Sequence, residues 1–189
     1  MINIKFPFYA PKRASFMLAA EQYLAADIKD FSSEELLFTW ESPGLSKTDN
    51  KGLKYLGKGC FALSYVSPMA EIQFANMKFV SLMGLLVRKA GIDDAYTDGD
   101  LVKTGDFTLA QNSFYKEGGS SVMHSTLFYD ADPLEVERQT GLKTASFKDH
   151  GCTLEKEGLK EFITGMLCQE QKKLTFSQIK EIRKIENGK

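Results

Sequence analysis

Residues 99–130 read GDLVKTGDFTLAQNSFYKEGGSSVMHSTLFYD and are the most informative part of the chain. Apolar and polar residues alternate along it, which is typical of half-buried strands. With the residues just before it, the stretch predicts three strands, over roughly 95–103, 106–114 and 121–129. Thr104-Gly105 and Gly118-Gly119 mark the turns, because glycine adopts the backbone angles that tight hairpins require. We therefore expect an antiparallel meander in this half of the chain.

Further elements are predicted on both sides of this stretch. Alternation predicts strands over 2–8, 35–40 and 60–66. A helical apolar period predicts helices over about 15–28, capped by Ser15, and over 69–90, stopped by Gly91.

Three shorter helices are predicted towards the C-terminus. They begin at Pro133, at Thr153 and at Thr175, where Thr175 and Gln178 form a capping box. The second helix is expected to turn five apolar side chains inward: Leu159, Phe162, Ile163, Met166 and Leu167. The order of elements predicts the α+β class, with a mixed β-sheet backed by helices.

Length and composition are those of a single globular domain. We expect one domain over 1–189, in which 153–189 form a helical C-terminal extension. The chain is 43% apolar and 26% charged, with a net charge of −1, which argues against binding to nucleic acid or to an anionic membrane. No apolar run is long enough to span a bilayer, and the N-terminal sequence does not resemble a signal peptide.

The three cysteines, Cys60, Cys152 and Cys168, are widely spaced, which fits free thiols in a reducing cytoplasm. With only two histidines in the chain, no metal site is expected. Cys152 is the stronger candidate for a nucleophile, because His150 is two residues away on a loop expected to be exposed. The simpler interpretation is a surface thiol. Cys60 is expected on a buried strand, where a thiolate is costly.

Several segments, in order along the chain, resemble the lipoate/biotin protein ligase family, in particular its lipoate-protein ligase A-like members. Gly99-Asp100-Leu101, Gly105 and HSTLFYD (124–130) are similar to the family's Asn-Asp-Leu segment, its turn glycine and its His-(Gly/Ser)-Thr-Leu-Leu strand ending in Asp. SFMLAAEQYLAA (15–26), LLFTWESP (36–43) and ALSYVSP (62–68) are similar to its first helix and two of its strands. The resemblance implies the biotin/lipoate protein ligase-like (class II aminoacyl-tRNA synthetase-like) fold. It also implies transfer of lipoate, octanoate or biotin to a Lys of a carrier domain.

Two parts of the family's catalytic apparatus are not matched. Phe107 stands at the position of the essential Lys, two residues after the turn glycine. An ammonium group there stabilises the charge that develops during acyl transfer, and a phenyl ring does not. The family's Arg-Arg-x-Ser/Thr-Gly-Gly-Gly segment has no counterpart in the short interval between Trp40 and Ser64. Gly57, Lys58 and Gly59 remain there as candidates for a phosphate-binding nest, and a plain turn before a strand is the simpler interpretation.

Lys103 is the nearest replacement for the missing Lys. If Thr104-Gly105 is a two-residue turn, Lys103 pairs with Asp106, and Val102 pairs with Phe107. Because successive strand residues alternate between faces, Lys103 is then expected opposite Phe107, in a surface ion pair with Asp106. This register argues against rescue by Lys103.

The resemblance also implies ligand-binding roles for Ser64, Asp100, Gly105 and His124. His124 stands where the family has a His near the acyl pocket, and Asp100 where it has an Asp that helps to order the adenylate and its metal. Each residue also has a simpler interpretation: a half-buried His satisfied within its strand, and an Asp that caps a turn.

We interpret the chain as a degenerate lipoate/biotin-ligase-fold protein without catalysis, to which no catalytic residue and no cofactor is assigned. It would bind an acyl-type ligand or a protein partner, such as a lipoyl or biotinyl carrier domain or a ligase partner subunit. One alternative is an active lipoate/octanoate-protein ligase or acyltransferase with relocated catalytic groups. Another is a scaffold-only interaction module. An open apolar pocket beside Phe107 with basic residues at its mouth would favour acyl binding, and a filled pocket the scaffold role.

Overall fold

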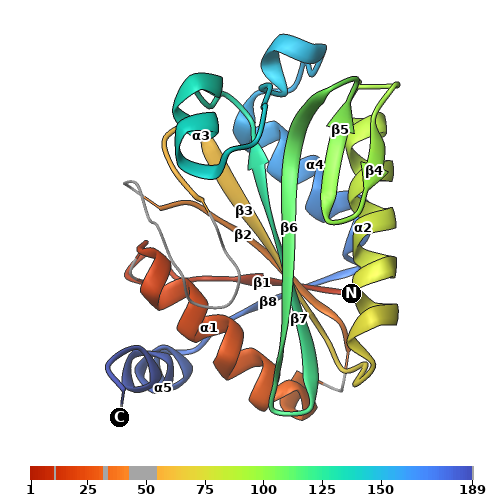
Figure 1. Ribbon diagram of the computed structural model, residues 1–189. Coiled ribbons are helices and arrows are strands. Elements are labelled where there is room, and N and C mark those ends of the chain that lie inside the picture. The colour runs from red at the N-terminus through yellow and green to blue at the C-terminus, as the bar shows by residue number, and fades with distance from the viewer. Residues whose placement is uncertain (11, 32–33, 43–54, 189) are drawn as a thin grey trace.

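The computed structural model describes residues 1–10, 12–31, 34–42 and 55–188. Within these ranges, eight strands form one sheet in the order β4-β5-β6-β7-β3-β2-β1-β8 (Figure 1). The strands are β1 (Ile2–Lys5), β2 (Leu36–Trp40), β3 (Cys60–Ser67), β4 (Tyr96–Asp98), β5 (Leu101–Thr104), β6 (Phe107–Glu117), β7 (Ser120–Phe128) and β8 (Glu170–Lys173). β1 runs parallel to both of its neighbours, and the other pairs are antiparallel. The sheet is therefore mixed, as the sequence predicts.

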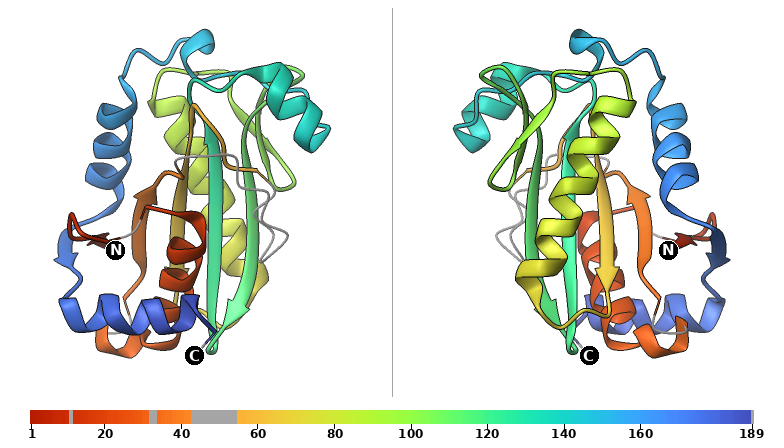
Figure 2. Two further views of the ribbon diagram at one scale, coloured as in Figure 1. Left: turned by 90° about the vertical axis from the view of Figure 1, so that its left-hand side faces the viewer. Right: turned by 90° about the vertical axis from the view of Figure 1, so that its right-hand side faces the viewer.

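Helices cover both faces of the sheet. They are α1 (Ala14–Ala26), α2 (Ile72–Lys89), α3 (Pro133–Thr140), α4 (Lys156–Leu167) and α5 (Phe176–Glu186). Figure 2 shows α1 and α5 on one side of the sheet and α2 on the other. The core has two parts: an α1-side core, to which α1 and α5 contribute, and an α2-side core, to which α2 and α4 contribute. This arrangement confirms the α+β class. No helix in the described ranges has the length and apolar character needed to cross a membrane.

The central strands β3 and β7 are buried along their whole length, because a helix layer covers each face. Alternation divides their side chains between the two cores. Val122 and Phe128 of β7 lie in the α1-side core, and Met123 and Leu127 lie in the α2-side core. His124, two residues after Val122, therefore faces α1. The same alternation determines the face of the sheet on which each polar residue of these strands lies.

The β5–β6 turn differs by one residue from the prediction. Gly105 and Asp106 form it, rather than Thr104 and Gly105, so that Thr104 pairs with Phe107. Gly105 has a φ of +51°, and placing it first in the turn supplies the positive φ that a tight hairpin needs there. Both Thr104-Gly105 and Gly105-Asp106 can form a two-residue turn, and the pairing of β5 with β6 selects the second.

This register changes the partners of Lys103. It pairs with Thr108 across the strands, and the expected ion pair with Asp106 is wrong. Lys103 Nζ lies 3.4 Å from the carboxylate of Asp98. Lys103 still lies on the face opposite Phe107, because its neighbour Thr104 pairs with Phe107.

A β-bulge follows in the same hairpin. Val102 pairs with Ala110, whereas the next residue, Lys103, pairs with Thr108, so Leu109 is an extra residue in β6. Leu109 and Ala110 both lie in the α2-side core, and Phe107 packs against that core. Thr108 therefore points to the α1 face together with Lys103.

Other differences lie at element ends. The strand predicted over 95–103 is divided into β4 and β5 by a turn at Gly99 and Asp100. Ser15 does not cap α1, whose N-cap is Arg13, and its hydroxyl donates instead to the Glu186 carboxylate. The capping box of Thr175 and Gln178 at α5 is confirmed.

The C-terminal part holds a strand that was not predicted. β8 consists of the four exposed residues EQKK, which show no apolar alternation, and it forms the edge of the sheet beside β1. In α4, Leu159 and Ile163 are buried as expected, whereas Met166 is 44% exposed. The predicted inward position of Met166 is wrong, because it lies beyond the stripe that faces the sheet.

Replacing Gly59 by alanine should lower the free energy of unfolding by about 3 kcal/mol or more. Gly59 has a φ of +80°, and a Cβ there would lie 2.1 Å from the backbone oxygen of Asp130. Gly141→Ala is the control, because Gly141 has a φ of +73° with nothing within 4 Å of its would-be Cβ, so only the backbone cost of about 1–2 kcal/mol remains. Urea unfolding followed by circular dichroism measures both variants. Equal losses would contradict the close-approach argument.

Candidate functional site

A fully buried carboxylate, that of Glu21, lies at the centre of the α1 face. α1 is buried on nearly all sides, and Glu21 has no solvent exposure. Ser64 Oγ donates a hydrogen bond to Glu21 Oε1, and the Tyr115 hydroxyl donates to Oε2 at 3.0 Å. Burial and the charge of Glu21 raise the pKa of Tyr115, which therefore stays a hydrogen-bond donor. A buried carboxylate is tolerated only with such partners.

His124 completes this cluster from β7. Its side chain is fully buried, and Nδ1 lies 3.3 Å from Glu21 Oε2 and 3.4 Å from Oε1. Within the described residues, Nε2 has no hydrogen-bond partner. His124 pairs across the strands with Ser64 of β3, so the sheet register brings both residues to the same carboxylate. We call Glu21, Ser64, Tyr115 and His124 the Glu21 cluster.

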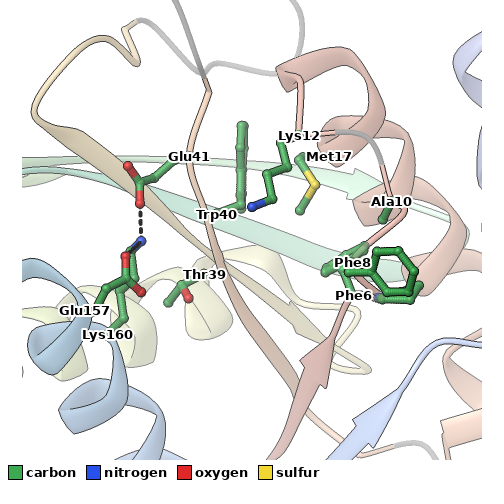
Figure 3. A pocket seen from close by; sticks show the side chains of 11 residues that line it. Phe6, Phe8, Ala10, Lys12, Met17, Thr39, Trp40, Glu41, Glu157 and Lys160 are labelled. Carbon is green, nitrogen blue, oxygen red and sulfur yellow. Dashed lines mark hydrogen bonds and ion pairs between the residues drawn. The ribbon is translucent and has the colours of Figure 1, made fainter.

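Trp40 joins the Glu21 cluster to a cavity. Its indole Nε1 donates to Ser64 Oγ at 2.8 Å, and its ring lines a cavity of about 320 Å³ at the end of β2. Figure 3 shows Lys12 between Trp40 and Met17, with its ammonium end towards the indole. The wall is completed by apolar and charged side chains from α4, β2 and the segment after β1: Phe6, Pro7, Phe8, Ala10, Thr39, Glu41, Glu157 and Lys160. We call this space the Trp40 cavity.

The charged side chains that line the Trp40 cavity differ in whether they already form ion pairs with one another. Glu41 forms ion pairs with Lys156, at 2.6 Å, and with Lys160. Burial opposes its charge, but the hydrogen bonds from these two ammonium groups hold the pKa of Glu41 below its ordinary value. Lys160 also pairs with Glu157, at 2.8 Å. Lys12 is exposed and is the lining cation best placed to meet an added anion.

Gly57, Lys58 and Gly59 form a turn that leads into β3. The amide of Cys60 donates to the Gly57 carbonyl at 3.1 Å, and Gly59 lies against the backbone of Asp130. Lys58 lines a second cavity, of about 500 Å³, whose other side chains include three carboxylates: Asp130, Asp132 and Glu135. Such surroundings repel a phosphate more than they attract it. The phosphate-binding role of this turn stays a prediction.

Asp100 and Gly105 lie at the two ends of β5, away from the Glu21 cluster. Asp100 Oδ1 accepts a hydrogen bond from Asn76 of α2 at 3.2 Å. The Gly105 carbonyl accepts one from the Tyr96 hydroxyl at 2.8 Å. Both residues therefore make contacts within the hairpin and with its nearest helix, and the ligand roles implied by the resemblance stay predictions.

Phe107 lies far from His124. Ser113 is the residue of β6 that pairs with His124, and Phe107 is six residues before it, which corresponds to about 20 Å along the strand. The Lys143 ammonium lies 4.5 Å from the centre of the Phe107 ring, and the His150 ring centre lies 5.8 Å away. The partly buried ring therefore contacts a cation, an imidazole and the α2-side core.

Eight site residues were predicted. Gly57, Lys58 and Gly59 lie together because they are adjacent in the sequence. Of the other five, only Ser64 and His124 lie beside the same group, the Glu21 carboxylate. Sequence reasoning did not single out Glu21, Trp40 or Lys12. For Glu21 a signal was present, because a charged residue inside the apolar run 14–26 indicates either a buried partner or a functional role. The position of Lys12 beside the cavity has no signature in the sequence.

The thiols do not form a nucleophilic site. Burial raises the pKa of Cys60 to about 11, and burial also raises the pKa of Cys152. Cys152 is buried, so its predicted exposure is wrong, and its Sγ lies 3.9 Å from the Leu154 carbonyl. His150 Nδ1 faces the Ser146 carbonyl instead of the thiol. All three cysteines are free, as predicted.

Comparisons with known proteins rest on structure alone. No family model and no curated protein matches the sequence. A putative lipoate protein ligase from T. acidophilum with bound lipoic acid matches the whole chain over 95% of its own length, with a TM-score of 0.75 and 11% identity. A P. falciparum lipoate ligase in complex with lipoate matches 99% of the chain over 70% of its own length, with a TM-score of 0.71 and 12% identity.

Two further solved structures extend the comparison. Lipoate-protein ligase A bound with ATP matches the whole chain over 94% of its own length, with a TM-score of 0.71 and 10% identity. A biotin protein ligase from Leishmania major, in complex with biotinyl-5-AMP, matches 86% of the chain over 70% of its own length, with a TM-score of 0.54 and 9% identity. Identities this low carry information on fold alone. The chain has the fold of the lipoate- and biotin-protein ligases, which confirms the fold expected from the sequence resemblance.

Proposed function

We propose that the protein binds a small acyl-type carboxylic acid in the Trp40 cavity and neither activates nor transfers it. The observation that carries this proposal is the start of β6. Phe107 faces the α2-side core, and Thr108 faces the α1 side. Neither residue offers the ammonium group that acyl transfer requires, so the conclusion holds for both faces of the strand.

The Trp40 cavity supports the binding part of the proposal. Its apolar wall, formed by Phe6, Met17 and Trp40, suits a hydrocarbon chain or a dithiolane ring. Lys12 supplies a cation for the carboxylate, since the carboxylate of Glu41 is already neutralised by two lysines. A volume of about 320 Å³ is of the size that small ligands occupy.

A protein partner belongs to the same proposal. One structure with this fold is described as a bipartite lipoate protein ligase and its E2 lipoyl domain, with a TM-score of 0.67 and 10% identity. By analogy, a lipoyl or biotinyl carrier domain or a ligase partner subunit is the expected partner class. Binding without transfer would make this chain an accessory to protein lipoylation.

The hairpin register supports a second candidate function, an active ligase with a relocated cation. Lys103 pairs with Thr108, so its side chain shares the α1 face with the Glu21 cluster. The ion pair with Asp106 that the sequence predicted does not form, so Asp106 does not neutralise Lys103, although Lys103 still lies on the face opposite Phe107. Lys103 is held by Asp98 at 3.4 Å, a partner that a substrate phosphate could displace.

Octanoate and lipoate should raise the midpoint of thermal unfolding. A ligand at about a hundred times its Kd stabilises the native state by about 2.7 kcal/mol, which corresponds to roughly 5–10 °C in a chain of this size. Lys12→Met should reduce the shift caused by octanoate but leave the shift caused by octanamide, because only the former has a charge for Lys12 to meet.

Two controls define the site of this binding. Lys180→Met removes an exposed lysine on α5, outside the Trp40 cavity, and should leave both shifts unchanged. Thr39→Phe fills the cavity and should abolish both. Binding that survives Thr39→Phe would place the ligand elsewhere, and the absence of any shift would reject the acyl-binding proposal.

The unmutated protein should not adenylate lipoate or octanoate, nor transfer either to a carrier domain. The loss of one such electrostatic contact typically costs about 10²–10³-fold in rate. Phe107→Lys alone should not restore turnover, because its side chain points to the α2-side core and the sequence does not match the family's Arg-Arg-x-Ser/Thr-Gly-Gly-Gly segment. Mass spectrometry of a carrier domain incubated with ATP and acyl donor measures transfer. Stoichiometric modification that disappears in Lys103→Met would establish the active alternative.

Thiol titration separates the proposal from a cysteine-dependent acyltransferase. After denaturation, a disulfide-exchange reagent should find three thiols. In the native protein at pH 7, Cys60 and Cys152 should react slowly, because burial raises the pKa of both thiols and the thiolate is the reactive form. Their rates should increase as the pH rises. A fast native reaction at Cys152 would instead support a nucleophile.

A further inference from the structure

The outer face of α2 carries an apolar stripe that no part of the described chain covers. Phe74, Met77 and Leu85 are 60%, 65% and 39% exposed. Together with Ser81, which is also exposed, they follow one another at spacings of three and four residues, so they lie along one line of the helix. Figure 2 shows α2 as the outermost layer on its side of the sheet. We call this line the α2 stripe.

The stripe is unusual because α2 is apolar on both sides. Its inner face already buries Phe79, Met83 and Leu86 in the α2-side core. A surface helix normally places polar residues opposite such a face. Aromatic and methionine side chains are enriched at interfaces between proteins, where a second surface removes them from water.

We propose that two copies of the chain form a dimer by packing their α2 stripes antiparallel about a twofold axis at Ser81. Ser81 is the smallest member of the stripe and lies four residues from both Met77 and Leu85. A small residue on the axis lets two helices approach to about 8–10 Å. A twofold contact of this kind uses the same surface on both copies, and it closes without forming a filament.

The apolar side chains match in this arrangement. Met77 and Leu85 each lie four residues from Ser81, in opposite directions, so Met77 of one copy is level with Leu85 of the other. Phe74 lies seven residues from the axis and is level with Arg88 of the second copy. Arg88 is oriented by its own hydrogen bond to the Ala95 carbonyl, at 2.9 Å, and its guanidinium suits the face of an aromatic ring.

The charges on the helix select the antiparallel direction. Glu71 is the N-cap of α2, and Arg88 and Lys89 lie in its last turn and after the stripe. Glu71 and Lys89 are eighteen residues apart, which is five helical turns, so both lie on the same flank. Glu71 and Lys89 lie on opposite sides of Ser81, so the twofold axis brings each Glu71 to within about 3 Å along the helix of the level of Lys89 of the second copy. A parallel pair would instead place the cations of the two C-terminal ends together, and it would align the two helix dipoles unfavourably.

The size of the stripe sets the expected affinity. α2 has 18 residues and is therefore about 27 Å long, and a single helix pair buries less than a standard interface of about 1,600 Å². We therefore expect a reversible dimer that forms at micromolar concentration. We favour a second copy over an unrelated helix as the partner, because the stripe of one copy matches the stripe of another in both residue spacing and charge.

Cross-linking of Ser81→Cys tests the axis directly. A residue on a twofold axis meets its own copy, so mild oxidation should give a covalent dimer in high yield. The variant is made together with Cys168→Ser, because Cys168 is the native thiol that is not fully buried. Gln73→Cys in the same background is the control, since it is exposed on the same helix but lies about 12 Å from the axis, which separates the two thiols by about 24 Å. Equal cross-linking of both variants would overturn the proposal.

Sedimentation analysis over a concentration series tests the non-covalent dimer. Met77→Lys should raise the dimer dissociation constant at least tenfold without lowering the unfolding midpoint, because Met77 is exposed in the single chain. Glu71→Lys and Lys89→Glu should each weaken the dimer a few-fold, and the double variant should restore it. If sedimentation shows the unmutated protein to be monomeric up to about 200 μM, the dimer is rejected. The finding that the α2 stripe binds another protein but not a second copy would also reject it.

Discussion

The carboxylate of Glu21 has no contact with solvent, and its need for buried partners ties α1 to the centre of the sheet. It sits on α1 and takes its hydrogen bonds from Ser64 of β3 and Tyr115 of β6, with His124 of β7 beside it. A buried charge that loses a partner costs several kcal/mol. The polar contact therefore helps to fix the position of α1 over three strands, together with the apolar packing around it. Trp40 extends this contact to β2 through Ser64 and places its ring beside the cavity.

The fold places the candidate acyl pocket far from Phe107, the residue at the position of the family's catalytic Lys. The Glu21 cluster and the Trp40 cavity lie together, where a helix and a strand meet. Phe107 lies about 20 Å along β6 and faces the opposite side of the sheet, because of the register after the Gly105 turn. A ligase needs both an acyl pocket and a cation at the reacting carbonyl. Under the proposals made above, the Trp40 cavity would supply the pocket, and Lys103, on the α1 face, would be a candidate for the second role.

The two faces of the sheet differ in the kind of binding that they suit. On the α1 side, the Glu21 cluster is buried, and the ligand site that we propose is the cavity at the end of β2. On the α2 side, the helix that closes the core exposes a second apolar line to solvent, which is characteristic of contact with another protein. The proposed ligand binding and the proposed self-association would therefore use different surfaces. A variant of the α2 stripe should leave acyl binding intact.

The class of the fold and its main elements followed from local patterns in the sequence. Alternation and turn residues identified the meander, the helical period identified α1 and α2, and the capping box located the start of α5. The sequence did not determine the register at Gly105, because Thr104-Gly105 and Gly105-Asp106 are both acceptable turns, and only the bulge and the pairing of β5 with β6 choose between them. β8 escaped detection because a four-residue edge strand with no buried face carries no alternation. The meeting of Glu21, Ser64, Tyr115 and His124 was decided by the tertiary structure alone, since hydrogen bonds between residues up to 103 positions apart leave no local pattern in the chain.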